Sequence, residues 1–134
     1  NPLVTIYIPT FNRIELLKRA LNSVVNQTYE NLEIIVVDDN SSDGTQEFLK
    51  NFSKKDPRVS YILKTDNSGA CVSRNLAIDK ANGLFITGLD DDDYFSLNRI
   101  EQLMDKSHLL NKYVFLYTYY LTVVAGGKYK KVRY

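Results

Sequence analysis

Four consecutive aspartates, Asp90 to Asp93, are the residues whose type and spacing point most directly to chemistry. Adjacent carboxylates repel one another, so a folded protein that keeps them together needs a compensating charge. A divalent cation that prefers oxygen ligands, such as Mg²⁺ or Mn²⁺, supplies that charge. It often uses only one or two carboxylates, while water and substrate phosphate complete its shell. The alternative is a solvated acidic turn before the helix that begins near Leu97, because acidic residues are favoured ahead of helix N-termini.

A second polar cluster runs from Asp38 to Thr45 and is rich in Asp, Asn, Ser and Gly. Asp38 and Asp39 directly follow an apolar segment, and Asp39 could accept hydrogen bonds from a nucleotide base or a ribose. The alternative is a simple turn that caps the next helix, a role that Asp43 or Thr45 would serve. Both interpretations stay open at this point.

A third cluster runs from Asp66 to Asn75. Gly69 permits a sharp turn into a helix. Arg74 would lie one turn inside that helix, where its guanidinium could bind an anion or hold an acidic loop, unless it is an ordinary surface arginine. Cys71 is expected to pack rather than to react, because no histidine lies near it in the sequence.

Short β-branched apolar segments alternate with helical patterns along most of the chain. The predicted strands are residues 4–8, 32–37, 59–63 and 84–89, and the predicted helices are residues 14–25, 45–52, 70–82 and 97–110. This alternation predicts right-handed crossovers and a mostly parallel, Rossmann-like sheet flanked by helices, an α/β/α sandwich. Residues 113–124 are predicted to form a fifth strand, or two strands. Asn12 is expected to cap the first helix, and Val72 is expected to face the core from the third.

Three polar segments follow the ends of predicted strands: Pro9 to Asn12, Asp38 with Asp39, and Asp90 to Asp93. Ligands of open parallel sheets bind outside the carboxyl ends of the strands. We therefore expect these segments, although they are far apart in the sequence, to meet at one rim of the sheet.

The composition indicates a single domain over residues 1–134. The chain is 44% hydrophobic and 25% charged, with a formal net charge of +1, which gives no case for nucleic acid as a partner. Its longest nearly apolar run, residues 113–125, is shorter than the roughly 20 residues of a membrane helix. The sole cysteine cannot form an internal disulfide, which favours a cytoplasmic location. The aromatic residues of that run and the basic residues after it leave peripheral contact with the inner face of a membrane as an alternative.

Four motifs, in this order, resemble the N-terminal, nucleotide-sugar-binding half of family 2 glycosyltransferases, which have the GT-A fold. They are Ile8-Pro9-Thr10-Phe11-Asn12-Arg13, Val37-Asp38-Asp39-Asn40-Ser41-Ser42-Asp43-Gly44-Thr45, Asn67-Ser68-Gly69 with Arg74-Asn75, and Leu89-Asp90-Asp91-Asp92-Asp93. Each motif alone is moderately specific, whereas the four together, at this order and spacing, are highly specific. The resemblance covers residues 3–110.

The resemblance implies a nucleotide-binding set and a metal ligand. The nucleotide-binding residues would be Pro9, Thr10, Phe11, Asn12, Asp39, Arg74, Asp90 and Asp91, and the metal ligand would be Asp92. Phe11 would place its ring against the base, and Asp39 would accept a hydrogen bond from it, with uracil as the expected base. Arg74 would brace the pocket, and Asp91 would approach the ribose. Asp92, which closes the Asp-x-Asp pattern begun by Asp90, would bind the Mn²⁺ or Mg²⁺ ion that bridges the diphosphate.

The reaction implied by the resemblance is inverting transfer of a sugar from a nucleotide-sugar donor, with UDP as the expected nucleotide, to a hydroxyl of a saccharide or lipid-linked acceptor, as in polysaccharide biosynthesis. The metal neutralises the leaving diphosphate while a carboxylate removes the acceptor proton. That base lies in a later segment of family members, and residues 113–134 contain no acid. The base is therefore expected beyond Tyr134, the C-terminal part of the fold looks absent, and the isolated chain is expected to transfer little or no sugar.

Two other classes of protein share parts of this pattern. A nucleotide-sugar-binding fragment without turnover would keep the same pocket. A phospho-receiver domain needs its acid pair on the first strand and a lysine on the fifth. Here Asp38 and Asp39 follow the second predicted strand, and residues 114–124 contain no lysine. The motifs therefore favour the transferase, with the fragment that only binds as its alternative.

Overall fold

The structure, a computed structural model of the 134-residue chain, describes residues 1–113, 115–118, 120–124 and 128–132. The chain divides into two compact units, Asn1–Arg99 and Ile100–Tyr134. The first unit contains all three polar segments that follow predicted strands, and each unit is described by itself.

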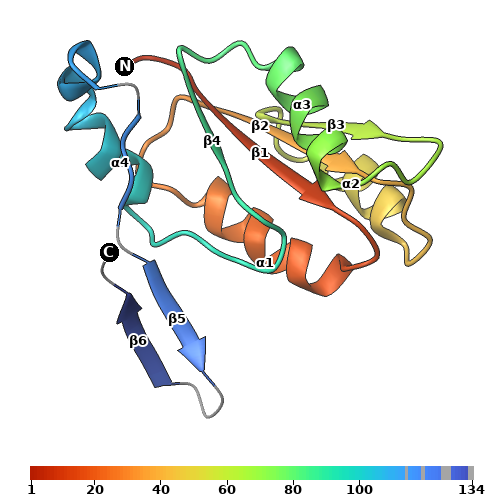
Figure 1. The fold of residues 1–134 in the computed structure, drawn as a ribbon. Coiled ribbons are helices and arrows are strands. Elements are labelled where there is room, and N and C mark those ends of the chain that lie inside the picture. Colours follow the sequence, from red (N-terminus) through yellow and green to blue (C-terminus); the bar gives the residue numbers. More distant parts are fainter. Residues whose placement is uncertain (114, 119, 125–127, 133–134) are drawn as a thin grey trace. The chain divides into compact units, whose positions relative to one another are not determined.

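A four-stranded, all-parallel sheet forms the centre of the first unit (Figure 1). Its strands are β1 (Val4–Thr10), β2 (Leu32–Asp38), β3 (Val59–Leu63) and β4 (Phe85–Gly88), in the spatial order β3-β2-β1-β4. The two inner strands, β1 and β2, are buried along almost their whole length, as is typical of parallel strands covered on both faces. The predicted parallel sheet is confirmed.

Three helices connect these strands: α1 (Ile14–Val25), α2 (Thr45–Ser53) and α3 (Ala70–Lys80). The chain steps from β1 to β2 to β3 through α1 and α2, and then returns through α3 to β4 on the other side of β1. Right-handed crossovers place α1 and α2 on one face of the sheet and α3 on the opposite face, because the direction of travel reverses. The reversal falls between β1 and β4, and open α/β sheets bind their ligands at such a point.

The core of this unit has one layer on each face of the sheet, because successive side chains of a strand point to opposite faces. The layer under α3 contains Ile35, Val37 and Ala77, with Tyr7, Ile62, Leu76 and Ala81 partly buried around them. On the other face, the fully buried strand residues include Ile6, Ile8, Ile34 and Val36, and α1 buries Leu17, Ala20, Leu21 and Val24. The expectations for Val72 and Cys71 are wrong. Val72 is 43% exposed and Cys71 is exposed, because Ser73 and Ala77 form the buried side of α3.

Two glycines allow β4 to lie close against β1. A Cβ at Gly83, just before β4, would lie 2.6 Å from the backbone nitrogen of Thr5, whose hydroxyl accepts the Gly83 N–H at 2.9 Å. A Cβ at Gly88, the last residue of β4, would lie 2.5 Å from the ring of Tyr7. The position of β4, and of the acidic loop that follows it, therefore depends on the absence of a side chain at these two residues.

The second unit differs from the sequence prediction in two elements. The predicted helix of residues 97–110 is instead α4 (Arg99–Met104) followed by the 3₁₀ helix η1 (Ser107–Asn111), because the backbone changes to i→i+3 hydrogen bonding at Lys106. Strands β5 (Tyr120–Val124) and β6 (Lys128–Val132) pair antiparallel, so residues 120–124 do not form a fifth strand of the parallel sheet. None of the helices in the described part of the chain has the length and apolar character to cross a membrane.

Candidate functional site

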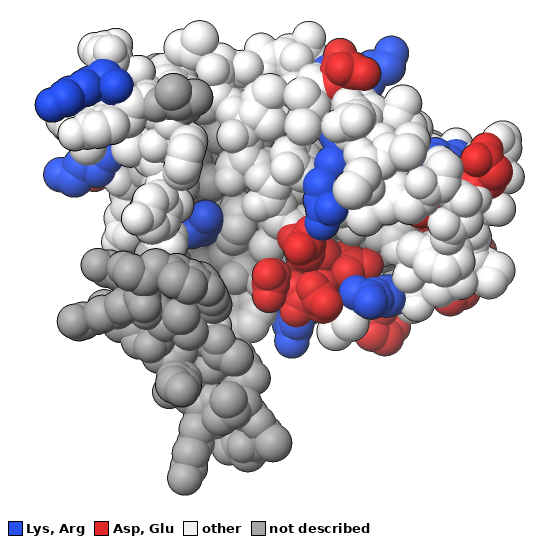
Figure 2. All heavy atoms as spheres, viewed as in Figure 1, with Lys and Arg blue, Asp and Glu red and all other residues white. Residues whose placement is uncertain are grey.

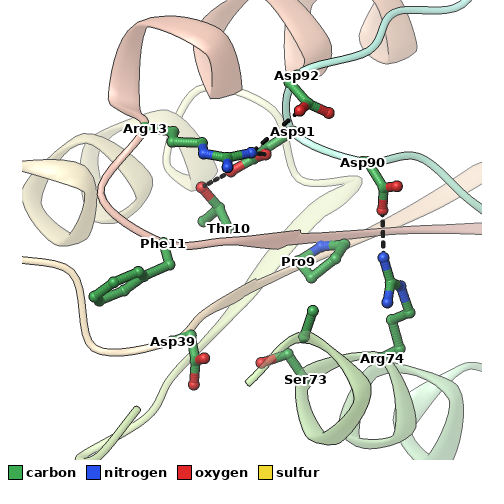
Figure 3. Close-up of a pocket in the computed structure, with 11 residues that line it drawn as sticks. Pro9, Thr10, Phe11, Arg13, Asp39, Ser73, Arg74, Asp90, Asp91 and Asp92 are labelled. Atoms are coloured by element: carbon green, nitrogen blue, oxygen red, sulfur yellow. Dashed lines mark hydrogen bonds and ion pairs between the residues drawn. The ribbon is translucent and has the colours of Figure 1, made fainter. Parts of the chain in front are cut away.

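A cavity of about 300 Å³ lies at the carboxyl ends of β1, β2 and β4 (Figure 3). Its lining residues are Pro9, Thr10, Phe11, Arg13, Asp39, Ala70, Ser73, Arg74, Asp90, Asp91 and Asp92. The three polar segments of the sequence thus meet at one rim of the sheet, as predicted, and the first two turns of α3 complete the wall. Of the residues predicted to bind nucleotide or metal, all but Asn12 line this cavity.

Asp91 connects the acidic loop after β4 to the end of β1. It is 5% exposed, and its Oδ2 accepts the Thr10 hydroxyl at 2.8 Å. Its Oδ1 accepts Nη1 of Arg13 at 3.2 Å. A buried carboxylate is tolerated only when it is paired and hydrogen-bonded, and these two partners meet that requirement. The loop is therefore fixed to β1 through Asp91.

Arginines pair with the carboxylates of Asp90 and Asp92. The same Nη1 of Arg13 lies 3.2 Å from Oδ2 of Asp92, and Arg19 donates to the backbone carbonyl of Asp92. Arg74 donates from Nη2 to Oδ1 of Asp90 at 2.7 Å. Figure 2 shows the resulting surface, an acidic patch with basic side chains around it. The expected repulsion among the four aspartates is therefore partly balanced by cations of the protein.

Asp39 lines the cavity beside Phe11, away from Asp90 and Asp92 (Figure 3). Its Oδ1 accepts hydrogen bonds from Nζ of Lys64 and from the Ser68 N–H (3.0 Å), and its Oδ2 accepts the neighbouring Gly69 N–H (2.8 Å). Burial alone would raise the pKa of Asp39. The hydrogen bonds, first that from Lys64, and the charge of Lys64 outweigh burial and hold this pKa below its ordinary value. Asp39 is therefore an ionised acceptor at neutral pH.

Asn12 joins two loops and does not line the cavity. It has a left-handed φ of 51°, its N–H donates to Oγ of Ser41, and its Oδ1 accepts the Ser42 N–H, both at 2.8 Å. The expectation that Asn12 caps α1 is wrong. Asp43 provides the cap, because its Oδ2 accepts the Ile14 N–H at 2.9 Å. Asn12 thus holds the loop after β2 against the loop after β1.

The acidic loop has free ligand atoms of the kind that a divalent cation uses. The side chains of Asp90 and Asp92 are each 53% exposed. Oδ2 of Asp90 and Oδ1 of Asp92 have no partner among the residues that the structure describes. Burial raises the pKa of Asp93, and the negative charges of Asp92 and Asp90 raise it further, while the charge of Arg19 acts in the opposite direction.

These atoms fit one type of cation site. The described residues contain no group of three or more His, Cys, Asp or Glu side chains that could enclose a metal ion. A cation that takes one or two carboxylates, and completes its shell with water and phosphate, needs no such group. The loop therefore fits an ion that binds together with a phosphate-containing ligand.

Four residues of the cavity or its supports were not singled out in the sequence: Arg13, Lys64, Ala70 and Ser73. Ala70 lies four residues before Arg74 on α3, so the two share one face of the helix, and this spacing could have identified Ala70. Ser73 directly precedes Arg74 and gives no such signal. Arg13 belongs to the first motif, where a cation directly after a strand-end loop is the signal. Lys64 directly follows β3, at the rim where the other ligand-binding segments were expected.

Solved structures identify the class of fold. The mannosyltransferase PcManGT from Pyrobaculum calidifontis, in complex with GDP-Man and Mn²⁺, matches with a TM-score of 0.73 and 25% sequence identity, over 79% of this chain and 32% of that chain. S. aureus TarS 1-349 in complex with UDP matches with a TM-score of 0.71 and 28% identity, over 78% of this chain and 32% of that chain. The fold is therefore the GT-A type of glycosyltransferases, as the sequence predicted.

The profile of Glycosyl transferase family 2 matches residues 5–133, and the chain belongs to this family. It is 45% identical over 117 residues to the putative colanic acid biosynthesis glycosyl transferase WcaA of Escherichia coli (strain K12), covering 87% of this chain and 42% of WcaA. It is 42% identical over 108 residues to the GalNAc(5)-diNAcBac-PP-undecaprenol beta-1,3-glucosyltransferase of Campylobacter jejuni, covering 80% of this chain and 35% of that enzyme. The chain spans less than half the length of these two relatives.

Proposed function

We propose that this chain is the donor-binding part of an inverting glycosyltransferase. It would bind a nucleoside diphosphate sugar, with UDP as the first candidate, through Mn²⁺ or Mg²⁺, and deliver the sugar to a hydroxyl of a saccharide or lipid-linked acceptor. The observation that carries this proposal is that one cavity has Phe11 and Asp39 on one side and Asp90 and Asp92 on the other (Figure 3). The first pair suits a base and the second suits a cation-bound diphosphate.

The proposed orientation of the nucleotide follows from the chemistry of these two sides. The ring of Phe11, 42% exposed, offers an apolar face to a base, and Asp39 offers an ionised acceptor to its edge. The ribose would then lie near Thr10 and Asp91, at the end of β1. The diphosphate would lie near Arg13 and the acidic loop, because charged donors bind phosphate oxygens strongly.

A cation bound at Asp92, with Asp90 beside it, would neutralise the negative charge that develops on the leaving diphosphate. Arg13 and Arg74 would donate hydrogen bonds at the same end of the cavity, and the tether from Asp91 to Thr10 would keep the acidic loop in place. The name of the Campylobacter jejuni relative supports a lipid-linked saccharide as acceptor. That of the Escherichia coli relative supports a role in polysaccharide biosynthesis.

A second candidate, donor binding without turnover by this chain alone, is favoured by one observation. Residues 113–134 contain no acid, and inverting transfer needs a carboxylate on the acceptor side to remove the hydroxyl proton. We propose that this base lies outside these 134 residues. Purified chain should then bind the donor while it transfers sugar slowly or not at all, and rapid turnover with any acceptor would contradict this assignment.

Calorimetry with UDP, in the presence and absence of Mn²⁺, tests the proposed site. We expect UDP to bind at least about tenfold more weakly without the metal, because unscreened phosphate and carboxylate charges repel each other. Asp92→Ala should remove this metal-dependent gain. Asp66→Ala, which removes an exposed aspartate outside the cavity, is the matched control and should keep it. Equal affinity for UDP with and without metal in the unmodified protein would overturn the proposal.

A further inference from the structure

The ion pair between Lys64 and Asp39 is the most deeply buried of the ion pairs in the described part of the chain. The side chains are 7% and 6% exposed, whereas the arginine–aspartate pairs of the cavity involve half-exposed groups. Lys64 directly follows β3, and Asp39 directly follows the neighbouring strand β2. The pair therefore joins the carboxyl ends of two strands at the rim that carries the cavity.

Burying two charges in this way is costly unless hydrogen bonds compensate them. Stability alone gives little reason to keep such a pair, since apolar residues of similar size often serve as well. Asp39, however, also lines the cavity. Three donors hold its carboxylate, namely Lys64 and the N–H groups of Ser68 and Gly69, and an ionised carboxylate has about four acceptor positions. One position, on Oδ2, is left for a ligand.

We propose that Lys64 is a positioning residue that sets the base selectivity of the site by keeping Asp39 ionised. An ionised carboxylate only accepts hydrogen bonds, so it selects bases that carry a hydrogen on the ring nitrogen of their pairing edge. Uracil and guanine have that hydrogen. Cytosine and adenine present a lone pair at the same ring position, which the carboxylate repels. This inference rests on the proposed function, because it requires the base to lie against Asp39.

The physical link between Lys64 and selectivity is the protonation state of Asp39. Without the hydrogen bond and the charge of Lys64, burial would act on a carboxylate held by two backbone N–H groups only, and the pKa of Asp39 would rise. A protonated carboxyl can donate its hydrogen to the lone pair of cytosine and can still accept from uracil. Neutral Asp39 would therefore distinguish the two bases poorly.

The charged groups of the cavity and of the adjoining strand ends leave Lys64 as the principal cation acting on Asp39. Asp38 precedes it on β2, Arg13 lies beyond β1, Arg74 lies on α3, and Asp90 to Asp92 lie beyond β4. Arg13 and Arg74 are already paired with these acidic residues. Among the side chains that the structure describes, Lys64 is the charged group whose interaction lowers the pKa of Asp39.

The affinities for UDP and CDP, and those for GDP and ADP, are compared with Mn²⁺ present. Because the two nucleotides of each pair match in size, the comparison works whether the cavity binds a pyrimidine or a purine. We expect the unmodified chain to prefer UDP over CDP, or GDP over ADP, by at least about tenfold, the value of one hydrogen bond to a charged group. Lys64→Met, which removes both the hydrogen bond and the charge at a similar side-chain length, should reduce this preference to within about threefold. Lys64→Arg keeps the charge and should preserve the preference.

A measurement on the unmodified chain keeps the test independent of the folding of any variant. Its preference should stay constant between about pH 5.5 and about pH 8, because Asp39 remains ionised throughout this range. A preference that is lost on acidification within the range, or one that survives in folded Lys64→Met, would overturn the role of Lys64. Failure of the proposed function gives a different result: no nucleoside diphosphate binds, or Asp39→Asn leaves the preference intact.

Discussion

The hydroxyl of Thr10 donates a 2.8 Å hydrogen bond to the carboxylate of Asp91, although the two residues are 81 positions apart in the sequence. Thr10 ends β1, and Asp91 lies in the loop after β4, the neighbouring strand. Both side chains are buried, so the bond joins the two sides of the point at which the strand order reverses. The acidic loop is thus held in place by the protein itself.

Thr10→Val tests this tether, because valine has nearly the same shape as threonine and lacks the hydroxyl. We expect a loss of about 1–3 kcal/mol in the free energy of unfolding, since a buried carboxylate oxygen loses its donor. We also expect weaker metal-dependent binding of UDP. Urea denaturation and calorimetry measure the two effects. Thr65→Val, which removes an exposed hydroxyl that contacts Asp66, is the control and should change neither quantity appreciably.

Arg13→Gln tests whether the guanidinium of Arg13 competes with a metal ion for the carboxylates of the acidic loop. Its Nη1 is shared by Asp91 and Asp92, so the variant should free an oxygen of Asp92 and increase the negative potential. We expect Mn²⁺ alone, without nucleotide, to bind about three- to tenfold more tightly, which corresponds to removal of one partly exposed opposing charge. Lys18→Gln, which removes an exposed cation paired with Glu15, is the control. Unchanged or weaker Mn²⁺ binding by folded Arg13→Gln would contradict this interpretation.

Asp43→Ala tests the cap of α1 and its dependence on pH. Burial would raise the pKa of Asp43, but hydrogen bonds from the Thr45 hydroxyl and from the Ile14 and Thr45 N–H groups lower it below the unfolded value. The stabilisation is therefore present above about pH 4 and is lost as the pH falls through the folded pKa. We expect Asp43→Ala to cost about 1 kcal/mol at neutral pH.

Urea denaturation at about pH 7 and about pH 3 measures this difference. The cost of Asp43→Ala should be smaller at the lower pH, where the carboxylate of the unmodified protein becomes protonated. Asp66→Ala removes an exposed aspartate and should have little effect at either pH. A cost that is the same at both pH values would show that the charge of Asp43 does not contribute to the cap.

Gly83→Ala and Gly88→Ala test how tightly β4 lies against β1. The added Cβ at Gly83 meets the backbone of Thr5, which cannot move aside, whereas at Gly88 it meets the end of the Tyr7 ring, which can. We expect both variants to be destabilised, by about 1–3 kcal/mol for Gly88→Ala and by more for Gly83→Ala. Thermal denaturation gives the comparison. The double variant Gly88→Ala with Tyr7→Leu should regain part of the loss, whereas Tyr7→Leu should not rescue Gly83→Ala.

The sequence was sufficient to predict the parallel sheet and the rim where the polar segments meet, because buried strands such as residues 34–37 are continuous apolar runs that end directly in polar residues. It could not predict the cap of α1. Asn12 has the right side chain and position, but Asp43, from another loop, takes the role in the tertiary structure. The pairing of Lys64 with Asp39 was equally hidden, because it depends on the neighbouring positions of β2 and β3.

The antiparallel pairing of β5 with β6 could not be predicted from the residue pattern of these segments. Residues 120–124 have the β-branched, aromatic pattern of a strand, but such a pattern does not specify the partner. The basic residues after this segment were considered only for contact with a membrane, whereas residues 128–132 provide its antiparallel partner. Charge pattern alone therefore obscured a hairpin that is local in sequence.

The charged side chains on the two sides of the cavity differ in solvent exposure, so the two sides should respond differently to ionic strength. Dissolved ions screen exposed charges strongly and buried charges weakly. The side chains of Arg13 and Asp92 are about half exposed, whereas those of Lys64 and Asp39 are more than nine-tenths buried. Added salt should therefore loosen the arginine contacts of the acidic loop while the carboxylate beside Phe11 stays fixed, so one side of the cavity adapts to the medium and the other is insulated from it.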